Sequence, residues 1–172
     1  MRLFVAAWPS PAVLEQLALI DRPPRPGIRW TPEDQWHVTL RFLGEIGGED
    51  VDRVKAALDQ LGSAGAGGPV TAVAGPALER LGQSVLCLPV AGLDELTAAV
   101  VALTSEFGVP VEDRSFRGHL TIARAGRAVN PRQPVPVPFS AAWEVEEVTL
   151  VASTLRPTGA RYEVIGRYRL DG

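Results

Sequence analysis

The chain has 172 residues, of which 46% are hydrophobic and 22% charged, and its formal net charge is -3. This length and composition predict one globular domain or two small lobes that share a core, and they exclude a disordered or fibrous protein. The negative charge argues against a protein that coats nucleic acid non-specifically, because such binding needs many cations.

Hydrophobic patterns in the first half predict strands at residues 3–8 and 36–43 and helices at residues 11–20 and 49–61. Ser10 is the expected N-cap of the first helix, because Pro11 suits the first helical position. The glycine-rich residues 62–68 predict a flexible connector to the second half.

The second half repeats this alternation of strands and helices, and its residues 131–138 are a proline-rich, extended segment. The expected elements are strands at residues 70–74, 85–90, 118–124, 142–153 and 162–170 and a helix at residues 93–107.

The two halves align at an offset of 82 residues, the difference between positions 119 and 37. Residues 3–6 then fall on residues 85–88, both in predicted strands, and residues 37–40 (HVTL) fall on residues 119–122 (HLTI). The repeat suggests two lobes related by a pseudo-two-fold axis, with a cleft between their sheets that holds one motif from each lobe.

Side chains of a strand alternate between its two faces, so His37, Thr39 and Arg41 share one face, and His119 and Thr121 share one face of the second strand. The opposite faces are apolar and belong to the core. Each lobe therefore offers one imidazole and one hydroxyl to the cleft.

Two histidines beside one phosphorus atom can divide the roles of base and acid, because an unperturbed imidazole titrates near a pKa of about 6.5. Threonine hydroxyls can donate hydrogen bonds to the phosphate oxygens, and this chemistry needs no cofactor. One alternative is that both histidines are structural. A zinc site is another, but two histidines need a further ligand and the only cysteine, Cys87, lies in an apolar strand.

At these residues the sequence resembles the 2H phosphoesterase superfamily, which is named for two HxTx motifs, and within it the bacterial and archaeal RNA 2',3'-cyclic phosphodiesterases, also called 2'-5' RNA ligase-like proteins. The likeness covers RLFVA at the start, RWTPEDQWHVTLRFLGE around the first motif and RSFRGHLTIAR around the second. Ser115 and Gly118 stand where many relatives have proline, so the loop before the second motif departs from the family pattern.

The resemblance implies an α+β fold: a single domain over residues 1–172, with two mainly antiparallel sheets facing a central cleft and helices on the outside. It implies metal-independent hydrolysis of a terminal 2',3'-cyclic phosphate to a 2'-phosphate, on RNA ends such as tRNA fragments or on cyclic nucleotides. By the same likeness His37 is the proton donor, His119 is the proton acceptor, and Thr39 and Thr121 hold the phosphate.

A locally basic stretch surrounds the second motif, since residues 114–143 contain no Asp or Glu. We expect Arg41 or Arg124 to act on the phosphate, although strict alternation sends Arg124 to the apolar face unless a bulge precedes it. We expect the remaining arginines of the stretch to steer RNA, and the alternative is a solvated loop. These steering residues are Arg114, Arg117 and Arg127, and Arg132 lies in the same stretch.

Trp30, Phe116 and Trp143 are candidates for stacking on a base, with core packing as the alternative. Two other functions remain open: joining of RNA ends through a 2'-5' linkage at the same site, and a non-catalytic RNA-binding or nucleotide-binding module. Two intact histidines speak against the module, because binding alone does not require titratable groups.

The single cysteine allows no intrachain disulfide, and no apolar run approaches the roughly 18 residues of a membrane span. Residues 2–8 are also too short for a signal-peptide core. We expect a cytoplasmic, monomeric protein.

Overall fold

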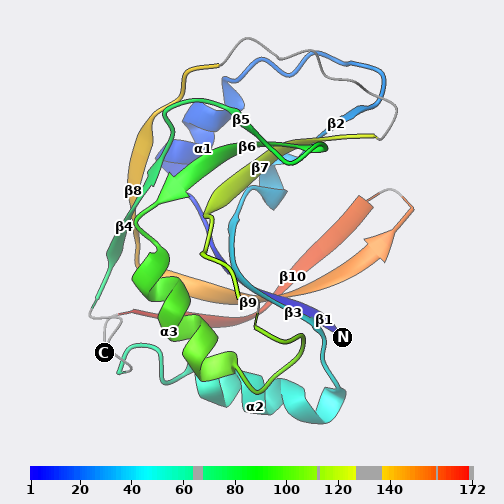
Figure 1. The fold of residues 1–172 in the computed structure, drawn as a ribbon. Helices are drawn as coiled ribbons and strands as arrows, with labels where there is room; N and C mark the ends of the chain where they lie inside the picture. The colour runs from blue at the N-terminus through cyan, green and yellow to red at the C-terminus, as the bar shows by residue number, and fades with distance from the viewer. Residues whose placement is uncertain (64–67, 112, 127–136, 158, 171–172) are drawn as a thin grey trace.

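The computed structural model describes residues 1–63, 68–111, 113–126, 137–157 and 159–170, and within these ranges the chain forms three α-helices and a ten-stranded sheet (Figure 1). In chain order the elements are β1 (Arg2–Ala7), α1 (Pro11–Ala18), β2 (Ile28–Trp30), a 3-10 turn (Glu33–Gln35), β3 (Val38–Glu45), α2 (Gly48–Leu58), β4 (Val70–Ala74), β5 (Glu79–Leu81), β6 (Val85–Ala91), α3 (Asp94–Thr104), β7 (His119–Ala125), β8 (Ala141–Val145), β9 (Glu147–Arg156) and β10 (Gly159–Arg169). No helix in this described part is long and apolar enough to span a membrane.

Most of these elements lie close to their predicted bounds. The predicted cap of α1 is confirmed, because the Ser10 hydroxyl accepts a hydrogen bond from the Val13 amide at 3.4 Å. The single strand predicted at residues 142–153 is wrong, since β8 pairs with β4 whereas β9 pairs with β1 and β10. The short strands β2 and β5 were not predicted, because three residues carry too little periodicity.

Two predicted segments fall largely outside the described residues. They are the glycine-rich connector, of which residues 64–67 are not described, and the proline-rich segment, of which residues 131–136 are not described.

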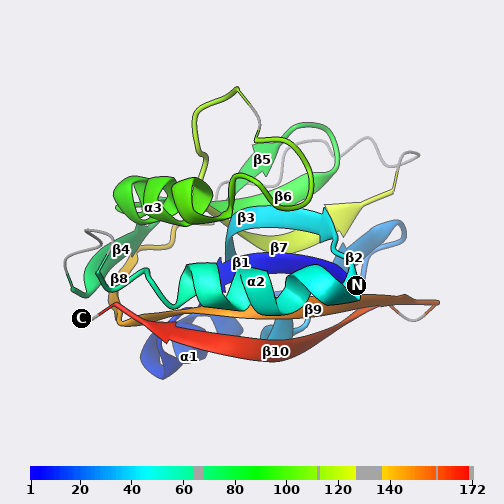
Figure 2. The ribbon, with the colours of Figure 1, turned by 90° about the horizontal axis from the view of Figure 1, so that it is seen from below.

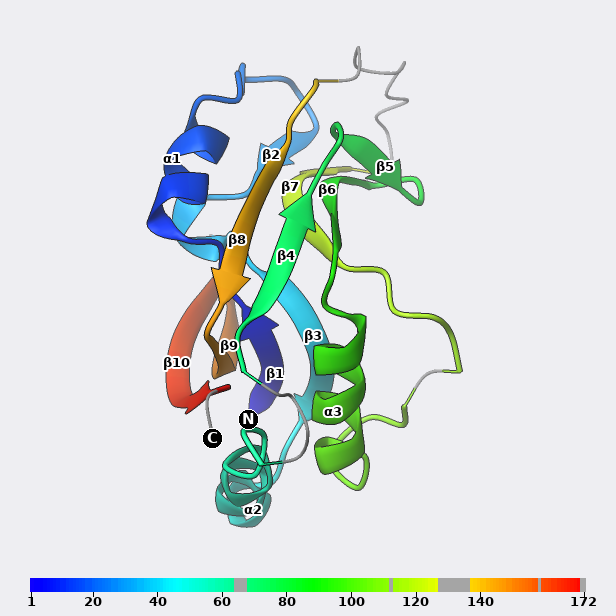
Figure 3. The same ribbon diagram turned by 90° about the vertical axis from the view of Figure 1, so that its left-hand side faces the viewer.

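All strand pairings are antiparallel, as predicted. The main path runs β10-β9-β1-β3-β7-β6-β4-β8, with β2 beside β7 and β5 beside β6. β3 and β7 meet at one residue pair, Val38 opposite Leu120. The prediction of two separate sheets is therefore wrong, because this junction joins the strands into one curled sheet (Figures 1 and 3).

The central strand β1 is buried on both faces. Leu3 and Val5 belong to the main core, which also contains side chains from all three helices. Figure 2 shows α2 and α3 on the outside of the sheet. On the other face, Phe4 and Ala6 pack with Val151 in a small apolar cluster. This second face lines the candidate site.

Candidate active site

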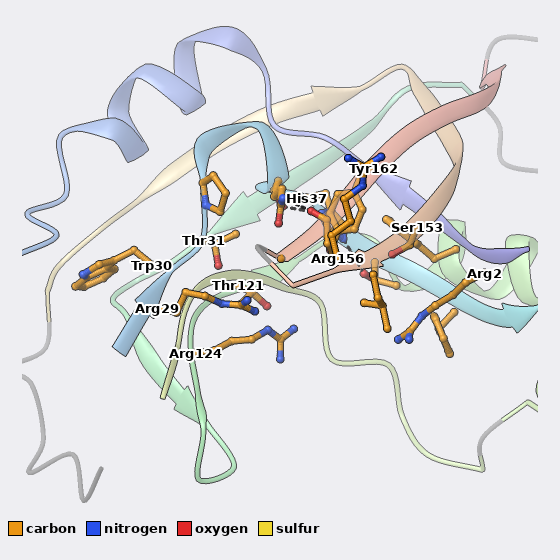
Figure 4. Close-up of a pocket in the computed structure, with 18 of the residues that line it drawn as sticks. Arg2, Arg29, Trp30, Thr31, His37, Thr121, Arg124, Ser153, Arg156 and Tyr162 are labelled. Atoms are coloured by element: carbon orange, nitrogen blue, oxygen red, sulfur yellow. Dashed lines mark hydrogen bonds between the residues drawn. The ribbon is translucent and has the colours of Figure 1, made fainter. Parts of the chain in front are cut away.

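The two HxT motifs meet where β3 joins β7. The antiparallel pairing of Val38 with Leu120 sets His37 beside Thr121 and Thr39 beside His119. All four polar side chains line one cavity of about 600 Å³ (Figure 4). The fold thus brings together all four motif residues that the sequence singled out, although the two motifs are far apart in the chain.

Two hydrogen bonds fix the ring of His37. Its Nδ1 atom lies 2.8 Å from the carbonyl oxygen of Gln35. Because a carbonyl only accepts, Nδ1 carries a hydrogen, and in the neutral ring Nε2 is an acceptor. The Thr39 hydroxyl, 3.1 Å from Nε2, donates to it. Nε2 is therefore the atom available for proton transfer.

Three aromatic side chains enclose His37. The ring centroid of Phe4 lies 4.9 Å from that of the imidazole in a stacked arrangement, and those of Trp8 and Tyr162 lie 5.3 Å and 5.4 Å away. Burial is the main cause that lowers the pKa of His37 to about 4, with smaller contributions from the charges of His119 and Arg124 against the Gln35 hydrogen bond. His37 is therefore neutral near pH 7 in the free protein.

His119 is oriented in the same way as His37. Its Nδ1 atom donates to the carbonyl oxygen of Arg117, two residues earlier, at 2.8 Å. This bond again leaves Nε2 as the proton-transferring atom.

His119 also lines a second cavity of about 290 Å³, together with Cys87 and Arg117. Burial raises the pKa of the Cys87 thiol to about 11, so this thiol is protonated near neutral pH.

Arg41 does not reach the pocket, so the prediction that it approaches the phosphate is wrong. Its side chain is buried, and its guanidinium donates to the carbonyl oxygens of Phe107 at 3.3 Å and Val109 at 3.0 Å. The reason is a β-bulge: Val5 pairs with Arg41 but Ala6 pairs with Thr39, which leaves one extra residue on β3. Alternation breaks there, and Arg41 turns to the opposite face.

A second β-bulge, on β7, brings Arg124 into the pocket. Leu86 pairs with Ala123 but Cys87 pairs with Thr121, so β7 also has one extra residue, Ile122. Ala123 is then buried, and Arg124 returns to the face of His119 and Thr121. The corresponding position of β3 is Phe42, which is 40% exposed and also lines the pocket.

The other predicted arginines lie elsewhere. Arg117 lines the smaller cavity, and Arg114 is exposed and does not line the main pocket. Arg127 and Arg132 are outside the described residues.

Three arginines that sequence reasoning missed line the pocket with Arg124: Arg2 on β1, Arg29 on β2 and Arg156 on β9. Two of them had a signal in the sequence, because Arg2 lies in RLFVA and Arg29 lies in RWTPEDQWHV, two of the stretches that carry the family likeness. Arg156 had none. No carboxylate is among the described residues that line this pocket. The pocket is therefore strongly cationic on a protein with a net charge of -3.

The predicted aromatic residues have different positions. Trp30 lines the pocket, and its indole donates to the Pro23 carbonyl oxygen at 3.0 Å. Phe116 lines the smaller cavity. Trp143 is buried and donates to the Trp8 carbonyl oxygen at 3.1 Å, so it packs in the core. Tyr162 and Phe42, which were not predicted, are further aromatic residues of the pocket.

Among the described residues, no three His, Cys, Asp or Glu side chains are grouped so that they could hold a metal ion.

Comparisons with known proteins give matches that cover the whole chain. Residues 8–69 match the family model described as LigT like Phosphoesterase. An RNA 2',3'-cyclic phosphodiesterase of Thermus thermophilus is 31% identical over 192 aligned positions that cover 100% of this chain and 91% of that protein. A protein of the same name from Geobacillus stearothermophilus is 28% identical over 83% of this chain and 48% of its own length.

Solved structures give the same result. The crystal structure of TT0787 from Thermus thermophilus superposes with a TM-score of 0.87 at 31% identity, covering 100% of this chain and 99% of that one. Escherichia coli LigT in complex with 3'-AMP superposes with a TM-score of 0.80 at 26% identity, covering 99% of this chain and 98% of that one.

Proposed function

The chain belongs to the LigT-like phosphoesterases of the 2H superfamily, and on that basis we propose that it hydrolyses the 2',3'-cyclic phosphate at the 3' end of RNA to leave a 2'-phosphate. The observation that carries the proposal is the pair of imidazoles, each with Nδ1 bound to a backbone carbonyl, in one pocket with two threonines and Arg124. This set of donors and acceptors matches what the reaction needs.

In the proposed reaction, Nε2 of His119 accepts a proton from water while the water oxygen attacks phosphorus. The bond between phosphorus and the 3' oxygen breaks, and protonated Nε2 of His37 donates its proton to that oxygen. The products are a 2'-phosphate and a free 3' hydroxyl. Thr39, Thr121 and Arg124 donate hydrogen bonds to the non-bridging oxygens, where charge accumulates in the transition state. No step requires a metal ion.

For this assignment His37 must gain a proton when substrate binds. Burial lowers the pKa of His37 to about 4 in the free protein. An opposite charge within about 4–6 Å raises the pKa of such a group by roughly 1–3, so a bound phosphate moves the pKa of His37 up toward neutral pH. Protonated Nε2 no longer accepts a hydrogen bond, and the Thr39 hydroxyl is then released to donate to the phosphate.

The test is incubation of the purified, chelator-treated protein with an RNA that ends in a 2',3'-cyclic phosphate and lacks a 5' phosphate. We expect a 2'-phosphate product and no loss of activity on chelation. A strict requirement for added divalent metal would contradict the mechanism. A 2'-5' joined product without hydrolysis would mean that the function is end joining. Binding of the RNA without either product would indicate a non-catalytic module.

A further inference from the structure

Arg29 and Arg124 lie directly opposite each other on neighbouring strands, since β2 pairs with β7 in the register Arg29 opposite Arg124. Both side chains line the pocket, and Figure 4 shows their guanidinium groups side by side next to Thr121. Like charges in directly opposite positions destabilise a sheet. Because no carboxylate is found among the described lining residues, an anionic ligand is the group that would neutralise this pair.

One cyclic phosphate does not account for the charge of the pocket. A phosphodiester carries a single negative charge, whereas four arginines line the cavity: Arg2, Arg29, Arg124 and Arg156. Excess cationic charge around a phosphate site is what contacts to further backbone phosphates require.

Arg29 lies beside the start of β10, whereas the charge of Arg124 acts on His37. Its Nη1 atom lies 3.7 Å from the position that a Cβ atom would take on Gly159, the first residue of β10. Tyr162, which contacts the His37 ring, is three residues further along this strand, or about 10 Å at the usual rise of a strand. The Arg29 guanidinium is therefore next to the β9–β10 turn, and Arg124, unlike Arg29, is among the charges that act on His37.

We propose that Arg29 binds the phosphodiester that links the terminal nucleotide to the rest of the RNA, so that the pocket recognises a polynucleotide end in preference to a lone cyclic nucleotide. This inference rests on the proposed hydrolysis. It assigns Arg124 to the reacting phosphate and Arg29 to the next phosphate along the chain.

The test compares two substrates that differ only in the second phosphate: adenosine 2',3'-cyclic phosphate, and the adenosine dinucleotide that ends in the same group. The Arg29→Ala variant should lose about tenfold more kcat/KM on the dinucleotide than on the mononucleotide, because only the dinucleotide has the phosphate that Arg29 contacts. Arg29→Lys should recover part of this difference, since it keeps the charge. The matched control is Arg161→Ala, since Arg161 is an exposed arginine of β10 that does not line the pocket. This variant should leave the ratio of kcat/KM on the dinucleotide to kcat/KM on the mononucleotide unchanged.

Binding of the 2'-phosphate form of the dinucleotide gives a readout that does not depend on turnover. Arg29→Ala should flatten the dependence of log affinity on log salt by about 0.7, the value for one phosphate contact on a single strand. Equal losses on both substrates, or an unchanged salt slope, would overturn the role of Arg29 and leave the hydrolysis intact. If the wild type hydrolysed neither substrate while the salt slope still depended on Arg29, the proposed function would fail and this phosphate contact would stand.

Discussion

His37 and His119 have the same backbone hydrogen bond but different surroundings. His37 is packed among Phe4, Trp8 and Tyr162, whereas His119 lies between two cavities. Desolvation disfavours the charged form of a buried imidazole, and this is why the pKa of His37 falls to about 4. The difference in surroundings, rather than in the motif, separates the two histidines chemically.

This difference predicts that an anion in the pocket is bound together with a proton. Sulfate is a suitable probe, because its charge does not change over the range titrated. The pKa of His37 is about 4 in the free protein and is expected to be higher in the sulfate complex. At a pH between these two pKa values, the complex holds more protons than the free protein does. Sulfate affinity should therefore rise as the pH falls through the pKa that His37 has in the complex.

Proton NMR can follow this titration directly, since the chain has only two histidines and the His119→Ala variant identifies the signals of His37. We expect a pKa of about 4 without sulfate and a higher value with it. A His37 pKa that is near 6.5 without sulfate, or that sulfate leaves unchanged, would contradict the coupling.

Arg41 and Arg124 offer a second contrast between single residues. Arg124→Ala should lower turnover about 100-fold, even on a mononucleotide, if its guanidinium stabilises the transition state. Arg41→Ala should instead lower the free energy of unfolding by about 1–3 kcal/mol, because it removes the donor to the Phe107 and Val109 carbonyls. Urea unfolding and steady-state kinetics on both variants measure the two effects. A turnover defect in a stably folded Arg41 variant would argue against the structural role.

At the scale of elements, two β-bulges decide which side chains face the pocket. The extra residues are Leu40 on β3 and Ile122 on β7, and they occupy corresponding positions of the repeat. Period-two alternation predicted the placement of both HxT motifs, because these precede the bulges. It failed for Arg41, which follows one. The local sequence gives no sign of a bulge, since the extra residue is set by the register with the neighbouring strand.

The segment after α3 is held against β3 by close backbone contacts. The Val109 amide donates to the Leu43 carbonyl oxygen at 2.9 Å. A Cβ atom on Gly108, which has a φ of +68°, would lie 1.9 Å from that oxygen. Only glycine fits there, because both the backbone conformation and the space exclude a side chain.

Gly108→Ala should therefore destabilise the protein by at least about 2 kcal/mol more than Gly82→Ala does. Gly82 is a matched control, since its φ of +63° imposes the same backbone strain but a Cβ atom there would meet nothing within 4 Å. Chemical denaturation of both variants gives the comparison. Equal destabilisation would mean that the segment can move away from β3 without cost.

At the scale of the whole molecule, a cationic pocket lies within an acidic chain. The arginines of this pocket come from β1, β2, β7 and β9, which are scattered from one end of the sequence to the other. Among the described arginines of the basic stretch predicted at residues 114–143, Arg124 is the one that lines it. Composition along the chain could not reveal the rest, because long-range strand pairing, such as that of β2 with β7, gathers these residues.

The central claim is that both histidines act together on the phosphate, and turnover of single and double alanine variants on RNA ending in a 2',3'-cyclic phosphate tests it most directly. His37→Ala and His119→Ala should each lower turnover by about 100-fold to 10,000-fold with unchanged circular dichroism spectra. The double variant should lose less than the product of the two effects, because the groups act as a unit. Full activity in either single variant would contradict the account.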